Sequence, residues 1–440
     1  MSKRIKPRLM KGMRDFLPDD MIKRNYVIDT VKRVFETHGF LPLETPTIEM
    51  WEVLSGKYGD DGEKLIYRFG DKGGRDLGLR YDLTIPLSRV VAMYQHRIVR
   101  PFKRYQIQPV WRADKPGKGR YREFYQCDVD VVGSADILAD AEVIQVSYEI
   151  MKSLGFHNFV IKINTRKILR GIVELSGVGV EMEAQICRSI DKLDKIGMEG
   201  VEEELLKRGI SQEAKDKIID YISIKGTPHM VILQAHTKLG GSEIALEGVE
   251  ELSLLRKYLE YMGINEENIS FDLALSRGLD YYTGPIFETV VEKPKIGSVT
   301  GGGRFDNLIG QYMGMDVPAT GNSIGLERII TVMDELNMYP DDLAYSTKVL
   351  ICRFDDEDME YTLKLAERLR KTGFNTEVYM GKSKLRGQLG YAADRNIPVI
   401  VIAGGDERAK GLLTLKNMQN REQTVIDEKN VCEEIQKILG

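Results

Sequence analysis

The 440-residue sequence has few of the residues that build disulfide frameworks or metal sites. Its four cysteines (Cys127, Cys187, Cys352 and Cys432) are scattered, and no two of them have the C-x-x-C spacing of a zinc knuckle. Its five histidines include no H-x-x-x-H pair, which argues against a metal site built from histidines. A disulfide-rich secreted protein is not indicated, and a reducing, cytoplasmic compartment is expected.

Long apolar runs and a strong net charge are absent as well. No apolar run approaches the ~20 residues that a membrane span needs, and residues 1–11 lack the apolar stretch of a secretory signal, so no membrane association is expected. The net charge is −4, so no overall basic field indicates a nucleic-acid partner, and any such surface must be local. Hydrophobic residues make up 42% and charged residues 30%, which is typical of a soluble globular protein.

The hydrophobic patterning predicts four regions. Residues 1–165 and 266–342 mix strands with helices and are interpreted as two parts of one core. Residues 166–265 are charged and helical, which indicates an insertion. Strands and helices alternate over residues 343–440, which is typical of a parallel or mixed α/β domain. One expected helix opens at residues 18–20 and stops at Gly39, and the others are 136–154, 182–195, 249–262, 359–371 and 384–394. The expected strands include 79–83, 103–111, 270–275, 286–292, 297–300, 348–353, 376–380 and 398–403.

A basic segment between Arg97 and Arg122 contains one acid, Asp114, and its loop at residues 115–120 predicts a hairpin. Guanidinium groups there suit a triphosphate, and loop lysines suit a nucleic-acid backbone. A solvated basic loop explains the composition equally well.

The strand that returns from this loop favours a binding site. Gln126, Asp128 and Asp130 alternate along it, so their side chains share one face. A face of Gln and Asp beside an arginine-bearing strand could hold an ammonium group and an imidazole.

Residues 276–284 combine Arg277, Asp280, Tyr281 and Tyr282 between two expected strands. A plain turn is one explanation, because glycines flank the segment. However, burying this set without a ligand is unfavourable, and an imidazole needs an acceptor, a donor and aromatic walls. The glycine-rich segment 300–306 allows close backbone approach but matches neither dinucleotide nor P-loop spacing. Arg328, where a strand gives way to a helix, is by itself best interpreted as a surface residue.

Taken together, these segments resemble the class II aminoacyl-tRNA synthetases, and specifically the histidine-specific members. Residues 39–46 are similar to the first class II motif, residues 111–114 with 122–124 to the second, and residues 325–328 to the third. The two histidine signatures are matched by residues 277–282 and 302–306, and the N-terminal segment by residues 11–15. Residues 343–440 resemble the anticodon-binding domain of class IIa enzymes, so the resemblance covers nearly the whole chain.

The resemblance implies an α+β catalytic core, built on an antiparallel sheet flanked by helices, with a helical insertion and a C-terminal α/β anticodon-binding domain. It implies histidine, ATP with Mg²⁺, and tRNA(His) as partners, and a homodimer built around the first motif. By position it assigns catalysis to Arg112 and Arg277; histidine binding to Asp82, Thr84, Arg112, Gln126, Asp130, Arg277, Tyr281 and Tyr282; and ATP binding to Arg112, Arg122, Arg328 and Glu327.

Four positions depart from the usual family pattern without changing their acidic or aromatic type. Phe305 stands where Tyr is usual, Trp111 where Phe is usual, and Asp82 and Asp114 where many bacterial members have Glu. The main alternative is a non-catalytic, histidine-binding regulatory subunit of the ATP phosphoribosyltransferase type. Such a subunit would be expected to lack the C-terminal domain and signature residues that this chain has. Another class IIa synthetase and a non-catalytic nucleic-acid-binding module are further alternatives, but neither explains the polar sets above.

Overall fold

A computed structural model describes residues 5–57, 62–276, 281–340, 343, 346–354 and 359–440, with residue 406 described by its backbone alone. The chain divides into two units. The first comprises Met1–Phe16 and Arg24–Tyr339, and the second comprises Leu17–Lys23 and Pro340–Gly440. No helix in the described part of the chain is long and apolar enough to cross a membrane.

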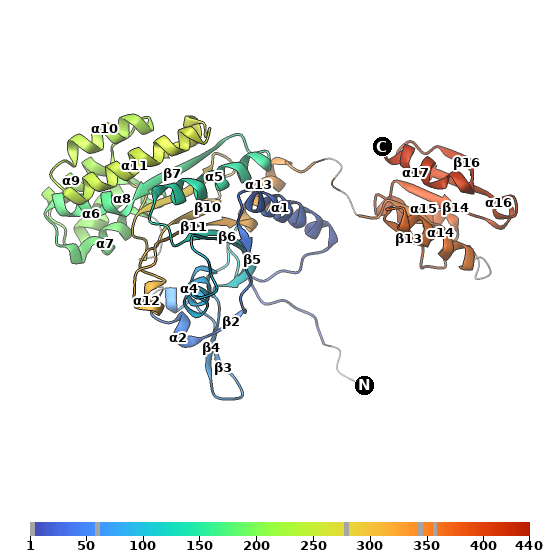
Figure 1. The fold of residues 1–440 in the computed structure, drawn as a ribbon, viewed down its shortest axis with the longest axis horizontal. Helices are drawn as coiled ribbons and strands as arrows, with labels where there is room; N and C mark the ends of the chain where they lie inside the picture. Colours follow the sequence, from blue (N-terminus) through green and yellow to red (C-terminus); the bar gives the residue numbers. More distant parts are fainter. Residues whose placement is uncertain (1–4, 58–61, 277–280, 341–342, 344–345, 355–358) are drawn as a thin grey trace. The chain divides into compact units, whose positions relative to one another are not determined.

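An eight-stranded sheet is the centre of the first unit (Figure 1). Its inner pairings are antiparallel, and the pairings at its two edges, β1 with β5 and β7 with β8, are parallel. The strands in spatial order are β1 (Leu41–Pro42), β5 (Phe102–Trp111), β6 (Glu123–Val132), β11 (Ala319–Gly325), β10 (Thr300–Arg304), β9 (Pro285–Val291), β7 (Phe159–Thr165) and β8 (Ile269–Phe271).

The central strand β6 separates an apolar face from a polar one. Cys127, Val129 and Val131 are buried in the main hydrophobic core together with residues of α1 (Pro18–Thr37), α5 (Ile137–Ser153) and α13 (Leu326–Leu336). The alternate residues, Gln126, Asp128 and Asp130, therefore lie on the opposite face of the sheet. This confirms the shared face that the alternation predicts.

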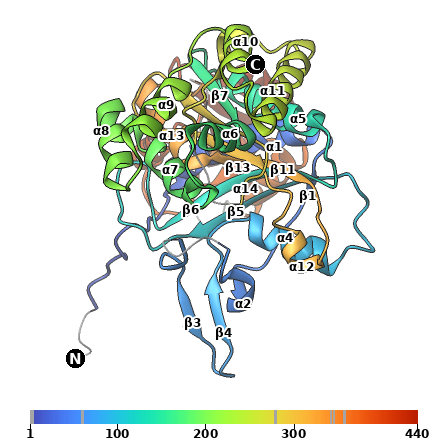
Figure 2. The ribbon, with the colours of Figure 1, turned by 90° about the vertical axis from the view of Figure 1, so that its left-hand side faces the viewer.

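A smaller three-stranded sheet with order β2-β4-β3 forms a ribbon that projects from the unit (Figure 2). Its strands are β2 (Ile48–Met50), β3 (Arg68–Gly70) and β4 (Asp76–Leu79). The short helices α2 (Trp51–Leu54), α4 (Thr84–Met93) and α12 (Gly310–Met313) pack near it, in a second apolar cluster with Phe305 and the two tyrosines, Tyr281 and Tyr282.

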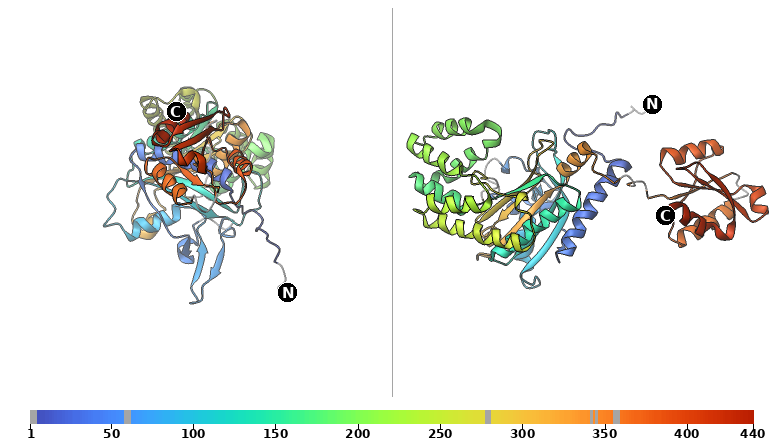
Figure 3. Two further views of the ribbon diagram at one scale, coloured as in Figure 1. Left: turned by 90° about the vertical axis from the view of Figure 1, so that its right-hand side faces the viewer. Right: turned by 90° about the horizontal axis from the view of Figure 1, so that it is seen from above.

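The region between β7 and β8 is helical, as the sequence predicts, and Figures 1 and 3 show its helices gathered at one end of the large sheet. Apolar residues of these helices, such as Ile172, Ile218 and Leu252, extend the main core into this region. The helices are α6 (Arg166–Ser176), α7 (Glu183–Ile190), α8 (Leu193–Lys207), α9 (Gln212–Ile222), α10 (Pro228–Lys238) and α11 (Glu243–Tyr261).

The second unit contains a five-stranded sheet with helices on both faces (Figure 3, right). Along β12, Val349 and Ile351 enter one apolar cluster, whereas Leu350 and Cys352 enter another, as expected for a strand covered on both sides. The strands in spatial order are β13 (Thr376–Val378), β12 (Val349–Ile351), β14 (Val399–Ile402), β15 (Leu412–Asn417) and β16 (Gln423–Asp427), and the helices are α14 (Met359–Lys371), α15 (Leu385–Asp394), α16 (Gly405–Ala409) and α17 (Val431–Leu439).

Several of the expected strands are wrong in extent. The strand expected at 79–83 ends at Leu79, because Arg80 turns inward and donates to the carbonyl oxygens of Thr45 and Pro109. The strand expected at 297–300 starts at Thr300 and runs on through the glycines to Arg304. The strand expected at 270–275 ends at Phe271, where the Asp272 carboxylate accepts the backbone N–H of Ala274 and forms a turn.

Candidate active site

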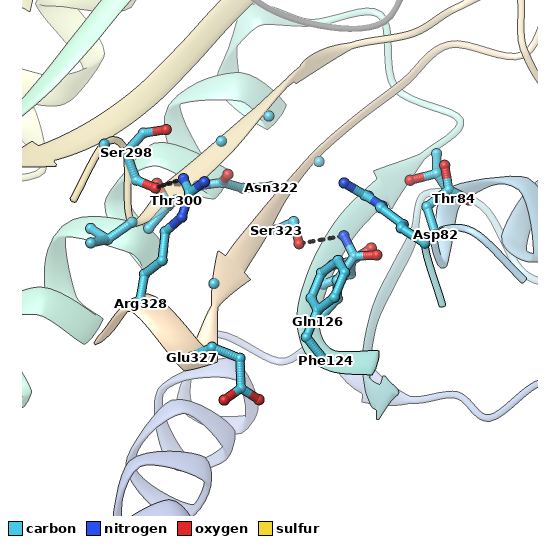
Figure 4. Close-up of a pocket in the computed structure, with 18 of the residues that line it drawn as sticks. Asp82, Thr84, Phe124, Gln126, Ser298, Thr300, Asn322, Ser323, Glu327 and Arg328 are labelled. Atoms are coloured by element: carbon cyan, nitrogen blue, oxygen red, sulfur yellow. Dashed lines mark hydrogen bonds between the residues drawn. The ribbon is translucent and has the colours of Figure 1, made fainter. Parts of the chain in front are cut away.

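A cavity of about 830 Å³ lies on the polar face of the large sheet, within the size range of small-molecule sites. Strands β6, β10 and β11 contribute to its lining, together with the loop between β5 and β6 and the start of α13. In Figure 4, Asp82 and Thr84 lie on one side and Ser298 and Arg328 on the other, with Gln126 and Ser323 between them. The two sides carry opposite charge.

The acidic end of the cavity is built by strand register. Asp128 of β6 pairs directly with Ser323 of β11, and Asp130 pairs with Gly321. The Gln126 side-chain amide donates to the Ser323 hydroxyl at 2.7 Å, and Asp128 is the direct cross-strand neighbour of Ser323. Four polar side chains thus converge on one patch of the cavity floor.

One buried arginine faces these acids. Arg104 of β5 is fully buried and forms an ion pair with Asp130 at 2.7 Å. Burial raises the pKa values of Asp128 and Asp130, Arg104 opposes the rise, and the neighbouring carboxylates, including Asp82, add to it. Among the described residues, this end of the cavity therefore has more buried carboxylates than adjacent cations, which suits a cationic ligand.

Glycines of β10 and β11 make room for this arrangement. A Cβ atom on Gly321 would come within 1.9 Å of the Asp130 Oδ1 atom. A Cβ atom on Gly302 would come within 2.0 Å of the Gly321 carbonyl oxygen. The glycine-rich segment therefore allows close packing of the strands beside the carboxylate. Its Arg304 has a structural role, because it is buried and ion-paired with Asp140 of α5.

Aromatic side chains wall the acidic end. The rings of Tyr281 and Tyr282 lie 4.9 Å apart, edge to face, and Tyr281 also meets Phe305 at 6.0 Å. Burial raises the pKa of Tyr281 well above its usual value. The Asp82 carboxylate accepts the backbone N–H of Ile85 in the first turn of α4, which fixes its direction.

The basic end combines arginines from loops and a helix start. Arg112 is stacked between the rings of Tyr81 and Phe124, at 4.3 and 5.1 Å, and its Nε donates to the Tyr81 carbonyl oxygen at 3.0 Å. Arg328 donates to the Ser298 carbonyl oxygen at 2.5 Å. Both line the cavity, so the structure brings these two predicted residues together.

Arg122 and Glu327 have different surroundings from the other predicted residues. Arg122 donates from Nε to the Asp114 carbonyl oxygen at 3.0 Å and from Nη1 to that of Lys11 at 3.4 Å. Glu327 borders the cavity, but Figure 4 shows its carboxylate directed away from Arg328. That carboxylate accepts two hydrogen bonds of 2.9 Å from Arg24 of α1.

An N-terminal strap, residues 11–16, connects these two residues. The Gly12 carbonyl oxygen accepts the backbone N–H of Arg122 at 2.8 Å. Arg14 lies 3.3 Å over the Tyr121 ring and forms an ion pair with Glu327. The strap therefore joins the loop between β5 and β6 to the start of α13.

Sequence reasoning missed several lining residues. Ser323 reaches the cavity through strand pairing, and Asp191 and Lys195 reach it from the insertion. Arg104 does not line the cavity but forms an ion pair with Asp130, which does. Arg120 lines the cavity from the basic loop, although Arg122 was the predicted phosphate ligand there. The alternation of β5 offered a signal for Arg104, whereas nothing local marked Asp191 or Lys195. Arg277 and Asp280 lie outside the described residues, so the role predicted for Arg277 stays a prediction.

Comparison with known proteins agrees with this geometry. Residues 12–329 match the family model described as histidyl-tRNA synthetase, and residues 348–438 match the anticodon-binding domain model. The chain belongs to the histidyl-tRNA synthetase family. The family prediction is therefore confirmed, and with it the prediction of an enzyme of the histidine–tRNA ligase class.

Individual members of the histidyl-tRNA synthetase family match this chain over nearly its full length and theirs. The histidine–tRNA ligase of Gloeobacter violaceus is 45% identical, over 95% of this chain and 96% of the relative. That of Aeropyrum pernix is 40% identical, over 99% of both chains. The crystal structure of histidyl-tRNA synthetase from Nostoc sp. PCC 7120 is 33% identical, has a TM-score of 0.87, and matches 99% of this chain and 100% of its own. The regulatory-subunit alternative is less supported.

Family membership also bears on fold and substrates. The predicted fold, a large sheet flanked by helices with a C-terminal anticodon-binding domain, is confirmed. The class II synthetase family uses ATP as a substrate, and the anticodon-binding domain indicates tRNA as a partner alongside histidine.

Proposed function

We propose that this chain activates histidine with ATP and transfers it to the 3′ end of tRNA(His). One observation carries the proposal: a single cavity has buried carboxylates at one end and arginines at the other. Such a cavity suits a substrate pair with a cationic amine at one side and a triphosphate at the other. The amino acid carboxylate would then lie between the two ends, where the new bond forms.

At the acidic end, each polar group has a part of histidine to hold. Asp82 and Thr84 bind the α-ammonium group, with Gln126 and Asp130 beside it. Tyr281 and Tyr282 close the pocket around the imidazole. A pocket that hydrogen-bonds its substrate rejects analogues without the polar group by ~10⁴–10⁵, because its own buried groups would be left unpaired. Specificity therefore follows from the polar character of this end.

At the basic end, arginines position the phosphates. Arg112 and Arg328 hold ATP phosphates, and Arg277 contacts the substrate carboxylate and the α-phosphate. Arg122 and Glu327 serve ATP indirectly, because their polar atoms hold the loop and the start of α13 in place. Stacking on Tyr81 and Phe124 keeps the Arg112 fork in one plane, which favours bidentate contact.

The reaction proceeds in two displacements. A carboxylate oxygen of histidine attacks the α-phosphorus of ATP, the bond to the bridging oxygen breaks, and pyrophosphate leaves with its electron pair. A hydroxyl at the 3′ end of tRNA then attacks the carbonyl carbon of histidyl-adenylate, loses its proton, and AMP leaves. Charge builds on phosphoryl oxygens, so positioning and electrostatic stabilisation by arginines supply most of the catalysis.

Magnesium enters this scheme as part of the substrate, MgATP. The ion commonly stays bound to nucleotide phosphates and several waters, with one or two carboxylates from the protein. Within the described residues, no group of three His, Cys, Asp or Glu side chains is placed to hold a metal ion.

The proposal extends to the organisation of the chain. Residues 1–165 and 266–342 form the catalytic core, residues 166–265 the insertion, and residues 343–440 the part that reads tRNA(His). A homodimer built around the first class II motif and a cytoplasmic location stay predictions from the resemblance and from the cysteine pattern.

The test is ATP–pyrophosphate exchange with each of the twenty amino acids in turn. Exchange with histidine alone is the expected result. Exchange with a different amino acid would keep the reaction and overturn the pocket assignment. Histidine binding without exchange would favour the regulatory alternative.

A further inference from the structure

The Ser323 hydroxyl lies between two side chains of β6. Because Ser323 pairs directly with Asp128 and diagonally with Gln126, its side chain reaches both on the same face of the sheet. The Gln126 amide nitrogen lies 2.7 Å from the hydroxyl oxygen, and the Asp128 side chain lies beside this hydroxyl because the two residues are direct partners across the strands. Figure 4 shows the Gln126–Ser323 hydrogen bond, and with Asp128 beside Ser323 the three groups can form a short relay across the cavity floor.

The direction of each hydrogen bond in this relay follows from donor and acceptor capacity. An ionised carboxylate only accepts, so Ser323 gives its single hydroxyl hydrogen to Asp128. The hydroxyl oxygen can then only accept from Gln126, which fixes the NH₂ group on the serine side. The Gln126 Oε1 atom is left as an acceptor, and it has no hydrogen-bond partner within the described part of the chain.

We propose that Asp128 and Ser323 are positioning residues that hold the Gln126 amide with its oxygen toward the cavity, where it accepts a hydrogen bond from the ammonium group of the substrate. This deepens the function proposed above and rests on it. Without the relay, the Gln126 amide can rotate by half a turn and present its NH₂ group to the cavity instead. Two hydrogen-bond donors, this NH₂ group and the substrate ammonium, would then face each other, which is unfavourable.

The relay predicts its own reversal when Asp128 gains a proton. A protonated Asp128 donates to Ser323, which then donates to the Gln126 oxygen and turns the NH₂ group toward the cavity. The charged groups that face Asp128 are Arg104 of β5, Asp130 of β6, and Asp82 before α4, with Ser323 on β11. Burial and the two carboxylates raise the pKa of Asp128 against the opposing effect of Arg104, so this proton is gained more readily than by an exposed aspartate.

The experiment is pyrophosphate exchange by the full chain and by Ser323→Ala, with the KM values for histidine and ATP measured separately. We expect the histidine KM to rise about 3- to 10-fold, as for the loss of one net hydrogen bond, with the ATP KM unchanged. Ser176→Ala is the matched control, because this buried serine in α6 bonds only a carbonyl of its own helix among the contacts described. It should change neither KM.

Two further measurements separate positioning from general damage. In a Gln126→Ala background, Ser323→Ala should add less than about twofold to the histidine KM, because both changes remove the same contact. We also expect the histidine KM of Ser323→Ala, divided by that of the parent, to fall toward one as the pH is lowered from about 8 to about 5.5. The reason is that protonation of Asp128 reverses the relay in the parent, which then loses the same contact as the variant. The ratio cancels the titration of the substrate itself.

The outcomes are distinct. No exchange with histidine by the parent chain would overturn the proposed function. If the parent exchanges normally, any of three results would overturn the relay alone. These are an unchanged histidine KM in Ser323→Ala, additive effects in the double variant, and equal changes in the histidine and ATP KM values. If the alanine variant does not fold, Ser323→Cys replaces it, because a thiol keeps the shape but is a weak donor.

Discussion

The two ends of the cavity are built in different ways. The acidic end lies on paired strands, and Asp128, Asp130 and Arg104 are almost completely buried. The basic end is built from a loop and a helix start, and the Arg120 side chain is 61% exposed. Strands fix side chains by register, whereas a loop can adjust around a large, charged and hydrated ligand.

This difference matches what each end has to do. Discrimination between amino acids needs donors and acceptors that stay in place, because the energy comes from leaving the wrong ligand unpaired. Phosphate binding needs charge and fork geometry, which tolerate more movement. We therefore expect substitutions at the two ends to affect different kinetic constants.

The largest effect is expected at Arg112 of the basic end. Arg112→Ala should reduce histidine-dependent pyrophosphate exchange by about 10²–10³-fold, as for loss of one preorganised donor that faces developing charge. Arg97→Ala is the control, because it removes an exposed arginine from the same basic segment. Exchange within about threefold of the parent would remove Arg112 from the catalytic set.

The next effect tests whether the acidic end acts on histidine alone. Asp130→Asn should raise the histidine KM about 10- to 100-fold, because a charged hydrogen-bond partner is lost, with the ATP KM unchanged. A thermal melt of the variant shows whether the Arg104 pair is needed for folding. Parallel rises in both KM values would mean that the two ends are not separate.

A smaller effect tests the loop construction of the basic end. Arg14→Ala removes the contact from the strap to Tyr121 and Glu327, and should raise the ATP KM about 2- to 5-fold, as for a partly exposed ion pair. Arg8→Ala is the matched control, because it removes an exposed arginine that precedes the strap. A change confined to the histidine KM would contradict the assignment of the strap to the phosphate end.

The smallest effect concerns stability and pH. Because burial raises the pKa of Asp128 above its unfolded value, the folded state binds this proton more tightly. The stabilising contribution is therefore present at acidic pH and lost as pH rises through the folded pKa. Relative to Asp128→Asn, the parent should lose on the order of 1 kcal/mol between about pH 5 and about pH 8, measured by denaturant unfolding. An opposite slope would place Asp128 in a more polar environment than the structure shows.

The same comparison explains what the sequence could predict. The period-two pattern of Gln126, Asp128 and Asp130 is local, so the shared face was predictable from residue spacing. Ser323 lies 195 positions from Asp128, and a single sequence contains no local signal for that pairing. Asp191 and Lys195 were missed for the same reason, since they reach the cavity from the insertion.

Errors in the predicted strands have a related cause. Residues 79–83 have the apolar alternation of a strand, but the buried Arg80 guanidinium finds backbone carbonyls in distant segments, and this tertiary contact outweighs the local preference. Glycine has a low propensity for strands, yet β10 contains glycines because the backbone of Gly321 lies too close to Gly302 for a side chain.

The pairing of β6 with β11 has a consequence for synthesis of the chain. A ribosome completes β6 early, but the partner that carries Gly321 and Ser323 follows nearly two hundred residues later. Until then the nascent polypeptide contains only part of the cavity, because Asp128 and Asp130 of β6 have not yet paired with β11. If the cavity is the histidine site proposed above, we expect histidine to stabilise only chains that have been translated beyond Gly325, so interrupted products should gain no protection from the amino acid against proteolysis.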